Sequence, residues 1–162
     1  MTAYDRMVHM LSRRDHSAHE IATKLRKAEH SDDEIQEALE FARARNWLPD
    51  DMTLAGREAG RLARAGKSPA QIQIWLKKKG LPTRGFKMPE GDGVSEEESA
   101  YKTASKAWNR LVRAAQRDVE KEKARNVQES LKLRVTRLLV TRGFSSSVVR
   151  AVFTRLLSEN PL

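Results

Sequence analysis

The sequence predicts an all-α protein made of tandem three-helix repeats, and three observations lead to this prediction. The first is a recurring pair, a β-branched apolar residue followed four positions later by leucine, at Ile21/Leu25, Ile72/Leu76 and Val135/Leu139. The second is a set of four Ser-x-x-Glu/Gln sequences typical of helix starts. The third is the lack of the period-two alternation typical of strands. Residues four apart lie on one face of a helix, so each pair offers an apolar ridge.

The three copies share more than this ridge. Gly80 and Gly143 stand four residues after the leucine in copies two and three, and Glu29 stands there in copy one. Copies one and three also have a second apolar pair, which begins ten residues after that leucine, at Ile35/Leu39 and Val149/Phe153. A helical hairpin that cannot bury its own apolar face must stack on a neighbour, so we expect a tandem array.

Helix starts are predicted from the four capping boxes, Ser17–Glu20, Ser31–Glu34, Ser68–Gln71 and Ser95–Glu98. Pro69 at a first helical position supports the third of them. In the first half of the chain we predict helices over residues 3–14, 17–28, 31–46, 51–65 and 68–79. Asp50 and Asp51 are interpreted as a cap and a first-turn acid of the fourth helix. We expect the glycines around this helix to allow close packing (Gly56, Gly60 and Gly66).

Residues 81–93 are predicted to form a loop or linker, because they contain Pro82, Gly85, Pro89, Gly91 and Gly93. The second apolar pair of copy two would fall at Phe86 and Glu90, inside this loop. Copy two is therefore expected either to be a two-helix hairpin or to take its third helix from Ser95 onward.

No glycine or proline occurs between Val94 and Arg142, but an array predicts a break in this stretch. The polar segment 122–130 is the predicted place, with Asn126 as the cap of the next helix. The run 118–125 alternates in charge, which indicates a solvent-exposed helix. A last helix is predicted over residues 145–158.

The predicted modules are residues 1–48, residues 49–93 with the linker, and residues 94–162 with a long helical segment. The net charge of +9 is unevenly distributed. Lysine and arginine minus aspartate and glutamate give −1 for residues 1–48, +6 for 49–88, −1 for 89–130 and +5 for 131–162. Two basic blocks on the second and third copies indicate a polyanion or an acidic protein as the partner.

Several classes of function are excluded or disfavoured by composition. The chain has no cysteine, its first residues lack an apolar signal-peptide core, and no apolar run approaches a membrane span, so we expect a cytoplasmic protein with no membrane partner. His16 and His19 lack a third metal ligand at helical spacing. Adjacent Asp15, His16 and Ser17 cannot form a hydrolase triad. No glycine-rich phosphate loop occurs. We therefore expect no enzyme, metal, cofactor or small-molecule substrate.

Three stretches of the chain resemble the RecX family of regulatory proteins. The first holds Leu11, Arg14, Ser17, Ile21, Lys24 and Leu25. The second is Trp47-Leu48-Pro49-Asp50-Asp51 followed by Arg57, Gly66, Pro69, Ile72, Leu76, Lys79, Gly80 and Leu81. The third holds Leu138, Leu139, Arg142, Gly143 and Phe144, with Val149 and Phe153. The resemblance covers residues 3–81 and 131–156. Leu54 and Glu58 stand where the family usually carries an aromatic residue.

The resemblance implies three tandem three-helix modules in an elongated, curved array. It implies a negative modulator of the RecA recombinase in DNA repair, recombination and the SOS response. Such a protein binds in the groove of the RecA–DNA filament and inhibits ATP hydrolysis and strand exchange.

Ten basic residues are the predicted filament- or DNA-binding residues. Seven lie in the second copy: Arg57, Arg61, Arg64, Lys67, Lys77, Lys78 and Lys79. Three lie in the third copy: Arg134, Arg137 and Arg142. Each set is also compatible with a solvated helix face whose cations complement the helix dipole. Contacts with the DNA phosphate backbone would make binding strongly salt-dependent.

Two alternatives use the same charges. One is a direct DNA-binding module of helix-turn-helix type with its recognition helix over residues 68–79. The other is a scaffold for a different acidic partner. Trp47 and Trp75 are expected to pack between modules rather than to stack on bases.

Overall fold

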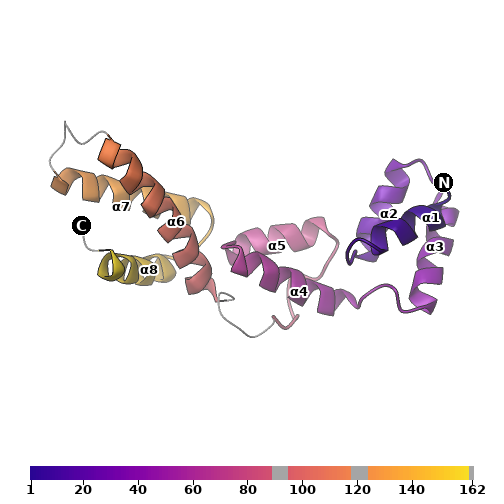
Figure 1. Cartoon of the computed structure of the whole chain (residues 1–162). Coiled ribbons are helices and arrows are strands. Elements are labelled where there is room, and N and C mark those ends of the chain that lie inside the picture. Colours follow the sequence, from indigo (N-terminus) through magenta and orange to yellow (C-terminus); the bar gives the residue numbers. More distant parts are fainter. Residues whose placement is uncertain (89–94, 118–123, 161–162) are drawn as a thin grey trace. The chain divides into compact units, whose positions relative to one another are not determined.

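The computed structural model contains eight α-helices among the residues that it describes, which are 1–88, 95–117 and 124–160 (Figure 1). These residues include no strand. The predicted all-α class is therefore confirmed. The chain forms two compact units, residues 1–59 with 74–88 (unit 1) and residues 60–73 with 89–162 (unit 2). The helices α4 (Asp51–Arg64) and α5 (Pro69–Lys78) contribute residues to both units. The three-module division stays a prediction.

Unit 1 contains a three-helix bundle. It consists of α1 (Ala3–Leu11), α2 (Ala18–Lys27) and α3 (Asp32–Ala44), which pack on one another in all three pairs. The predicted ridges supply the core, because Ile21, Leu25, Ile35 and Leu39 are all buried. Helix α1 ends earlier than the predicted residue 14, since Arg14 enters the connection that leads to α2.

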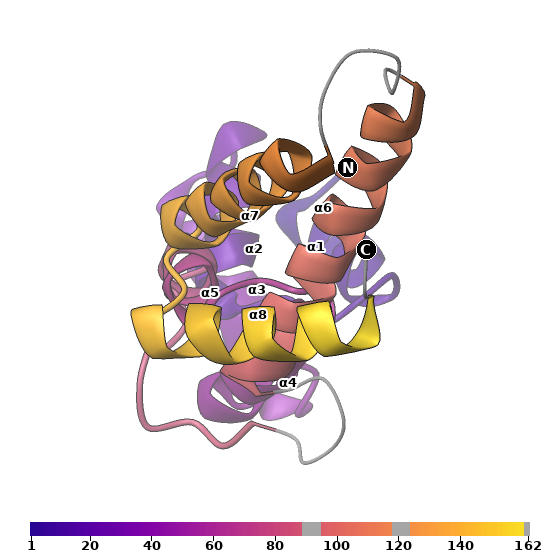
Figure 2. The same ribbon diagram turned by 90° about the vertical axis from the view of Figure 1, so that its left-hand side faces the viewer.

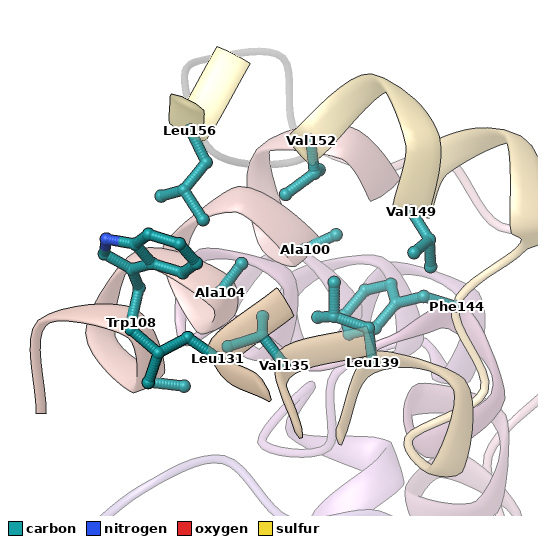
Figure 3. Packing of buried hydrophobic residues seen from close by; sticks show 11 residues of the cluster. Ala100, Ala104, Trp108, Leu131, Val135, Leu139, Phe144, Val149, Val152 and Leu156 are labelled. Atoms are coloured by element: carbon teal, nitrogen blue, oxygen red, sulfur yellow. The ribbon is translucent and has the colours of Figure 1, made fainter. Parts of the chain in front are cut away.

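Unit 2 contains a second three-helix bundle, in which α6 (Glu96–Arg117) packs on both α7 (Ala124–Thr141) and α8 (Ser146–Glu159) (Figure 2). Its core combines the predicted ridges of copy three with residues of α6. Figure 3 shows the buried Trp108 of α6 beside Leu131 and Leu156. It also shows Phe144 close to Leu139.

The predicted break over residues 122–130 is wrong for residues 124–130, which are helical. Helix α7 begins at Ala124, so Asn126 lies inside this helix and does not cap it. Alanine and arginine are strong helix formers, and the polar composition of this segment does not outweigh that propensity. Residues 118–123 of the predicted charged helix lie outside the described part of the chain.

No helix occurs over residues 81–88, and α6 packs on α7 and α8 but also donates hydrogen bonds to the end of α4. Both alternatives for copy two therefore stay predictions. The segment after α5 runs against α4 at Gly56. A Cβ at Gly56 would lie 2.1 Å from the carbonyl oxygen of Lys87. The close packing expected at this glycine is therefore with an extended backbone.

All four predicted serines cap their helices. The hydroxyls of Ser17, Ser31, Ser68 and Ser95 each accept a hydrogen bond from the backbone N–H three residues later, at 3.0 to 3.3 Å. Asp50 likewise accepts one from the N–H of Thr53, at 2.9 Å. These side chains satisfy backbone donors that a helix start leaves without a partner.

The repeat register is visible in the backbone at the ends of α2, α5 and α7. Glu29, Gly80 and Gly143, which occupy equivalent positions, all adopt left-handed conformations with φ of 64°, 65° and 86°. This conformation satisfies the last carbonyls of a helix and favours glycine. Copy one therefore accepts the steric cost of a non-glycine residue at Glu29.

Two of the capping serines also join one copy to the next. In unit 1 the hydroxyl of Ser17 donates to the carbonyl oxygen of Lys79, the residue before Gly80. In unit 2 the hydroxyl of Ser68 donates to the carbonyl oxygen of Arg142, the residue before Gly143. We call these two contacts the serine clasps.

Each serine clasp requires a glycine in the helix end that it holds. A Cβ at Gly80 would lie 2.4 Å from the Cβ of His19, two residues after Ser17. A Cβ at Gly143 would lie 2.9 Å from the Cβ of Ala70, two residues after Ser68. The two clasps are thus the same contact, made with the same register in both units.

Replacing Glu29 by glycine is expected to stabilise the protein by about 1 kcal/mol, because the left-handed conformation costs an L-residue about that much. Urea unfolding of Glu29→Gly and of the control Glu29→Ala would measure this gain. The alanine variant keeps the Cβ and should show no comparable gain. An equal gain in both variants would contradict the steric explanation.

Ser17→Ala is expected to lower the free energy of unfolding by about 2 kcal/mol, since it removes both a cap and a buried hydrogen bond. Ser31 is the matched control, because it caps α3 from an exposed position. Ser31→Ala should cost about 1 kcal/mol. Equal losses in urea unfolding would show that the clasp bond contributes nothing.

Candidate functional site

Unit 2 contains a cavity of about 860 Å³ in which half of the lining residues are cations. Its lining residues are Ala65, Lys67, Lys102, Thr103, Lys106, Ala107, Asn109, Arg110, Arg113, Ala114, Leu138 and Arg142. Six of these carry a positive charge, and none of these described lining residues is acidic. We call this hollow the basic cavity.

Helix α6 supplies one wall of the basic cavity. Lys102, Lys106, Arg110 and Arg113 follow one another at spacings of four, four and three residues, so they lie along one face of the helix. The stripe is about 16 Å long at the helical rise per residue. All four side chains are exposed. The opposite face of α6 carries the buried Ala100, Ala104 and Trp108.

The other cations come from the ends of two helices. Lys67 follows Gly66, which ends α4 with a left-handed φ of 82°. Arg142 precedes Gly143 at the end of α7. The Ser68 clasp holds the Arg142 backbone, while the hydroxyl of Thr103 donates to the Gly66 carbonyl oxygen at 2.8 Å. The end of α4 is therefore held against α6, and the end of α7 is held against the start of α5.

Two further side chains of α6, Ser99 and Lys102, connect this helix to the end of α4 within unit 2. The hydroxyl of Ser99 donates to the Ala63 carbonyl oxygen at 2.8 Å. The ammonium of Lys102 donates to the carbonyl oxygen of Arg64. The wall of the basic cavity is consequently built on packed helices, while the outer cations remain exposed to solvent.

Of the ten predicted binding residues, two come together in the basic cavity, Lys67 and Arg142. Arg134 and Arg137 are exposed on α7 and do not line it. Arg61 and Arg64 are exposed on α4, and Lys77 and Lys78 are exposed at the end of α5. Arg57 is exposed and forms a 3.1 Å ion pair with Asp15 in unit 1.

Lys79 has a structural role that the sequence did not reveal. Its ammonium lies 2.6 Å from a carboxylate oxygen of Glu20, and only 19% of its side chain is exposed. Arg14 also donates to this carboxylate, and the ammonium of Lys24 lies 3.5 Å from it. Reversing all of Lys77, Lys78 and Lys79 would therefore break this cluster and would not test binding alone.

The Glu20 carboxylate is the electrostatic centre of unit 1. Burial opposes its ionisation, but hydrogen bonds from Arg14 and Lys79 outweigh burial and lower the pKa of Glu20 to about 2. The neighbouring His16 is buried, and burial lowers its pKa. Neutral His16 donates from Nδ1 to the Arg14 carbonyl oxygen at 2.9 Å and accepts from the Lys24 ammonium at 3.1 Å.

The stripe Lys102, Lys106, Arg110 and Arg113 was missed in the sequence analysis. The net charge of residues 89–130 is −1, because acids on either side of the stripe cancel its cations. A count over one helix face would have found it, since these spacings place the cations together and the acids elsewhere. The informative feature is thus the spacing of three or four residues between the cations, which the net charge of a segment does not show.

The tryptophans differ from the prediction. Trp47 is 40% exposed, and its ring contacts Phe41 of the same bundle at 5.6 Å between centroids. Trp75 is half-buried, donates to Glu58 at 3.3 Å and lies under the Lys79 ammonium. These contacts of both indoles lie within unit 1.

Within residues 1–88, 95–117 and 124–160, no group of three or more His, Asp or Glu side chains could hold a metal ion. No helix in these ranges is long and apolar enough to cross a membrane.

The pH dependence of the free energy of unfolding should reveal the contribution of the Glu20 cluster. The carboxyl has a pKa of 4.5 when unshifted and about 2 in the fold, so its contribution is complete above about pH 5 and is lost as the pH falls toward 2. We expect Glu20→Gln to be less stable than the parent at neutral pH. Its stability should change less than that of the parent between about pH 5 and about pH 3. Urea unfolding at these pH values checks this, and parallel pH profiles would contradict it.

Comparison with known proteins gives one family. The family model for "RecX, first three-helix domain" matches residues 3–41. "Regulatory protein RecX" of Actinobacillus pleuropneumoniae serotype 5b (strain L20) is 36% identical over 80 residues, 49% of this chain and 52% of that protein. The protein of the same name from Geobacillus kaustophilus (strain HTA426) is 28% identical over 150 residues, 93% of this chain and 52% of that protein. The chain spans about half the length of the curated relatives it matches.

Two solved structures share the fold. "Crystal structure of RecX from Lactobacillus salivarius" is 20% identical with a TM-score of 0.59, covering 95% of this chain and 94% of that one. "Crystal structure of regulatory protein RecX" is 22% identical with a TM-score of 0.60, covering 94% of this chain and 71% of that one. The two structures show the shared fold, while the family model and the curated relatives support the resemblance predicted from the sequence.

Proposed function

We propose that this chain, which belongs to the RecX family, is a negative modulator of a RecA recombinase. The observation that carries the proposal is its similarity to "Regulatory protein RecX" over 150 residues, together with the family match in its first bundle. In this proposal the protein docks in the groove of the RecA–DNA filament. There it hinders ATP hydrolysis and strand exchange.

The basic cavity supports a contact with DNA phosphates in such a complex. Its cations come from α6 and from the ends of α4 and α7, and five of the six are exposed. Phosphate contacts position a protein on DNA without reading its sequence. A filament regulator needs this kind of contact, because the filament forms on DNA of any sequence.

Occupation of the groove accounts for both proposed inhibitory effects. A protein seated there takes the space of the incoming strand, which blocks strand exchange. If it also touches neighbouring protomers, it opposes the movement that accompanies ATP turnover. Both effects follow from binding alone, and the relatives are likewise named regulatory proteins.

The alternative helix-turn-helix function receives less support. The first turn of α5, which would read bases, begins at the fully buried Ser68. The hydroxyl of Ser68 is engaged by the Arg142 carbonyl oxygen, and Ala70 lies against Gly143. Recognition helices usually read bases with their N-terminal residues. At this end of α5 the exposed residues are Pro69 and Ala70, whose side chains cannot form hydrogen bonds with bases.

The test is inhibition of RecA ATPase and of strand exchange by substoichiometric amounts of the protein. We expect Lys106→Glu/Arg110→Glu to need at least about tenfold more protein for half-inhibition, because two exposed phosphate contacts are reversed. The free energy of unfolding should change little, since both side chains lie on the solvent side of α6.

A matched control carries the same change in charge in unit 1. Arg13→Glu/Lys27→Glu reverses two exposed cations outside the basic cavity and should inhibit about as well as the parent. An equal loss of inhibition in both double variants would show that the net charge, and not the basic cavity, causes the effect. No inhibition by the parent protein at all would refute the proposed function.

A further inference from the structure

The two serine clasps have the same geometry but differ in charge. In each clasp the third residue after the serine lies in the first turn of the helix that the serine caps. This residue is Glu20 in unit 1 and Gln71 in unit 2. The chain thus contains an internal comparison between an acidic and a neutral version of one junction.

In the acidic version of the junction, cations surround a buried carboxylate. The Glu20 carboxylate in unit 1 accepts hydrogen bonds from Arg14 and Lys79 and lies near Lys24. Only 9% of this carboxylate side chain is exposed. Three cations therefore gather around an anion that the chain itself supplies.

The neutral version leaves its cations without such an anion. Gln71 turns its amide oxygen back to the N–H of Ser68, at 3.1 Å. Arg142 takes the chain position that Lys79 has in unit 1, and it faces the basic cavity beside Lys67 and the α6 stripe. No carboxylate is present among the described residues that line this cavity.

The size and lining of the basic cavity fit a compact anion. Its volume of about 860 Å³ falls in the range of small-molecule sites, which is about 300–1,000 Å³. Lysines and arginines converge from three elements, and Asn109 and Thr103 add neutral polar groups. Several cations around a hollow suit several linked phosphates, each of which takes charge-assisted hydrogen bonds. A single carboxylate would leave most of these cations unpaired.

We infer that the basic cavity binds a short chain of linked phosphates, in the role that the Glu20 carboxylate has in unit 1. The phosphates come from a free nucleoside polyphosphate or from one strand of a nucleic acid. The inference rests on the cavity assigned under the proposed function but does not require the recombinase. The ligand would then act on this protein directly, before or apart from any filament.

The experiment is calorimetric titration of the full chain without RecA. Tripolyphosphate, ATP and an eight-residue oligothymidylate are the probes. We expect tripolyphosphate to bind one-to-one and Lys106→Glu to weaken it at least about tenfold. Gln71→Glu should weaken it similarly, because this change supplies the carboxylate that unit 1 already has. No measurable binding of tripolyphosphate, or equal binding by the parent and Lys106→Glu, would overturn the inference.

A control on the same helix separates position from charge. Gln73→Glu adds the same charge two residues further on, at an exposed position that is not equivalent to Glu20, and should change binding less than about twofold. An equal loss in Gln71→Glu and Gln73→Glu would overturn the role assigned to position 71. Unfolding curves of all variants confirm that the comparison concerns folded protein.

The three probes also distinguish the sources of phosphate. Tighter binding of ATP than of the oligothymidylate supports a free nucleotide as ligand. Tighter binding of the oligothymidylate, with competition by tripolyphosphate, supports a nucleic-acid strand. Failure of all three titrations with intact inhibition of RecA would refute this inference and leave the proposed function standing. The reverse result would refute the proposed function alone.

Discussion

The fold depends on one contact that the chain makes twice, the clasp between a capping serine and a carbonyl at the left-handed end of another helix. Each serine satisfies a backbone donor of its own helix and a carbonyl 62 or 74 residues away. The glycine beside that carbonyl lets the helices approach to a distance that a Cβ would prevent. Stacked repeats have no single common core, so such joins fix which copy meets which. Gly80 and Gly143 are therefore structural requirements, whereas Glu29, which no clasp engages, can carry a side chain.

The clasps also connect the architecture with the electrostatics. A clasp places the first turn of one helix, with its exposed N–H groups, beside the last turn of another, where cations favour the helix dipole. In unit 1 Glu20 neutralises the cations that gather there. In unit 2 the equivalent Gln71 is neutral, and four cations of α6 line the hollow that Arg142 also lines. The two junctions therefore share a geometry and differ in charge, which is the basis of the anion site that we propose for unit 2.

Local sequence features were enough to predict the fold. The site could not be predicted in the same way, because it depends on contacts between residues that are far apart in the sequence. Apolar ridges, serine caps and glycine ends act within one helix or one turn, and all four caps and the left-handed ends occur where the sequence places them. Lys79 and Arg142 look alike in the sequence, yet one pairs with Glu20 and the other lines the basic cavity. The difference is set by residues distant in the sequence, since Glu20 lies 59 positions from Lys79 and the α6 cations lie 29 to 40 positions from Arg142. The α6 stripe was hidden for another reason, because a sum over a segment ignores which face of a helix each charge occupies.

The basic cavity runs against the ordinary rules of stability. Lys102 and Lys106, Lys106 and Arg110, and Arg110 and Arg113 are like-charged neighbours on one helix face, and each such pair costs about 0.2–0.5 kcal/mol. Glutamates at alternate positions would remove this repulsion, as the exposed ion pair between Arg155 and Glu159 does on α8. Sites that break local rules without a structural gain are typically functional. A bound polyanion would relieve the repulsion and release counterions at the same time. This repulsive charge pattern is the physical reason for proposing a phosphate-bearing partner.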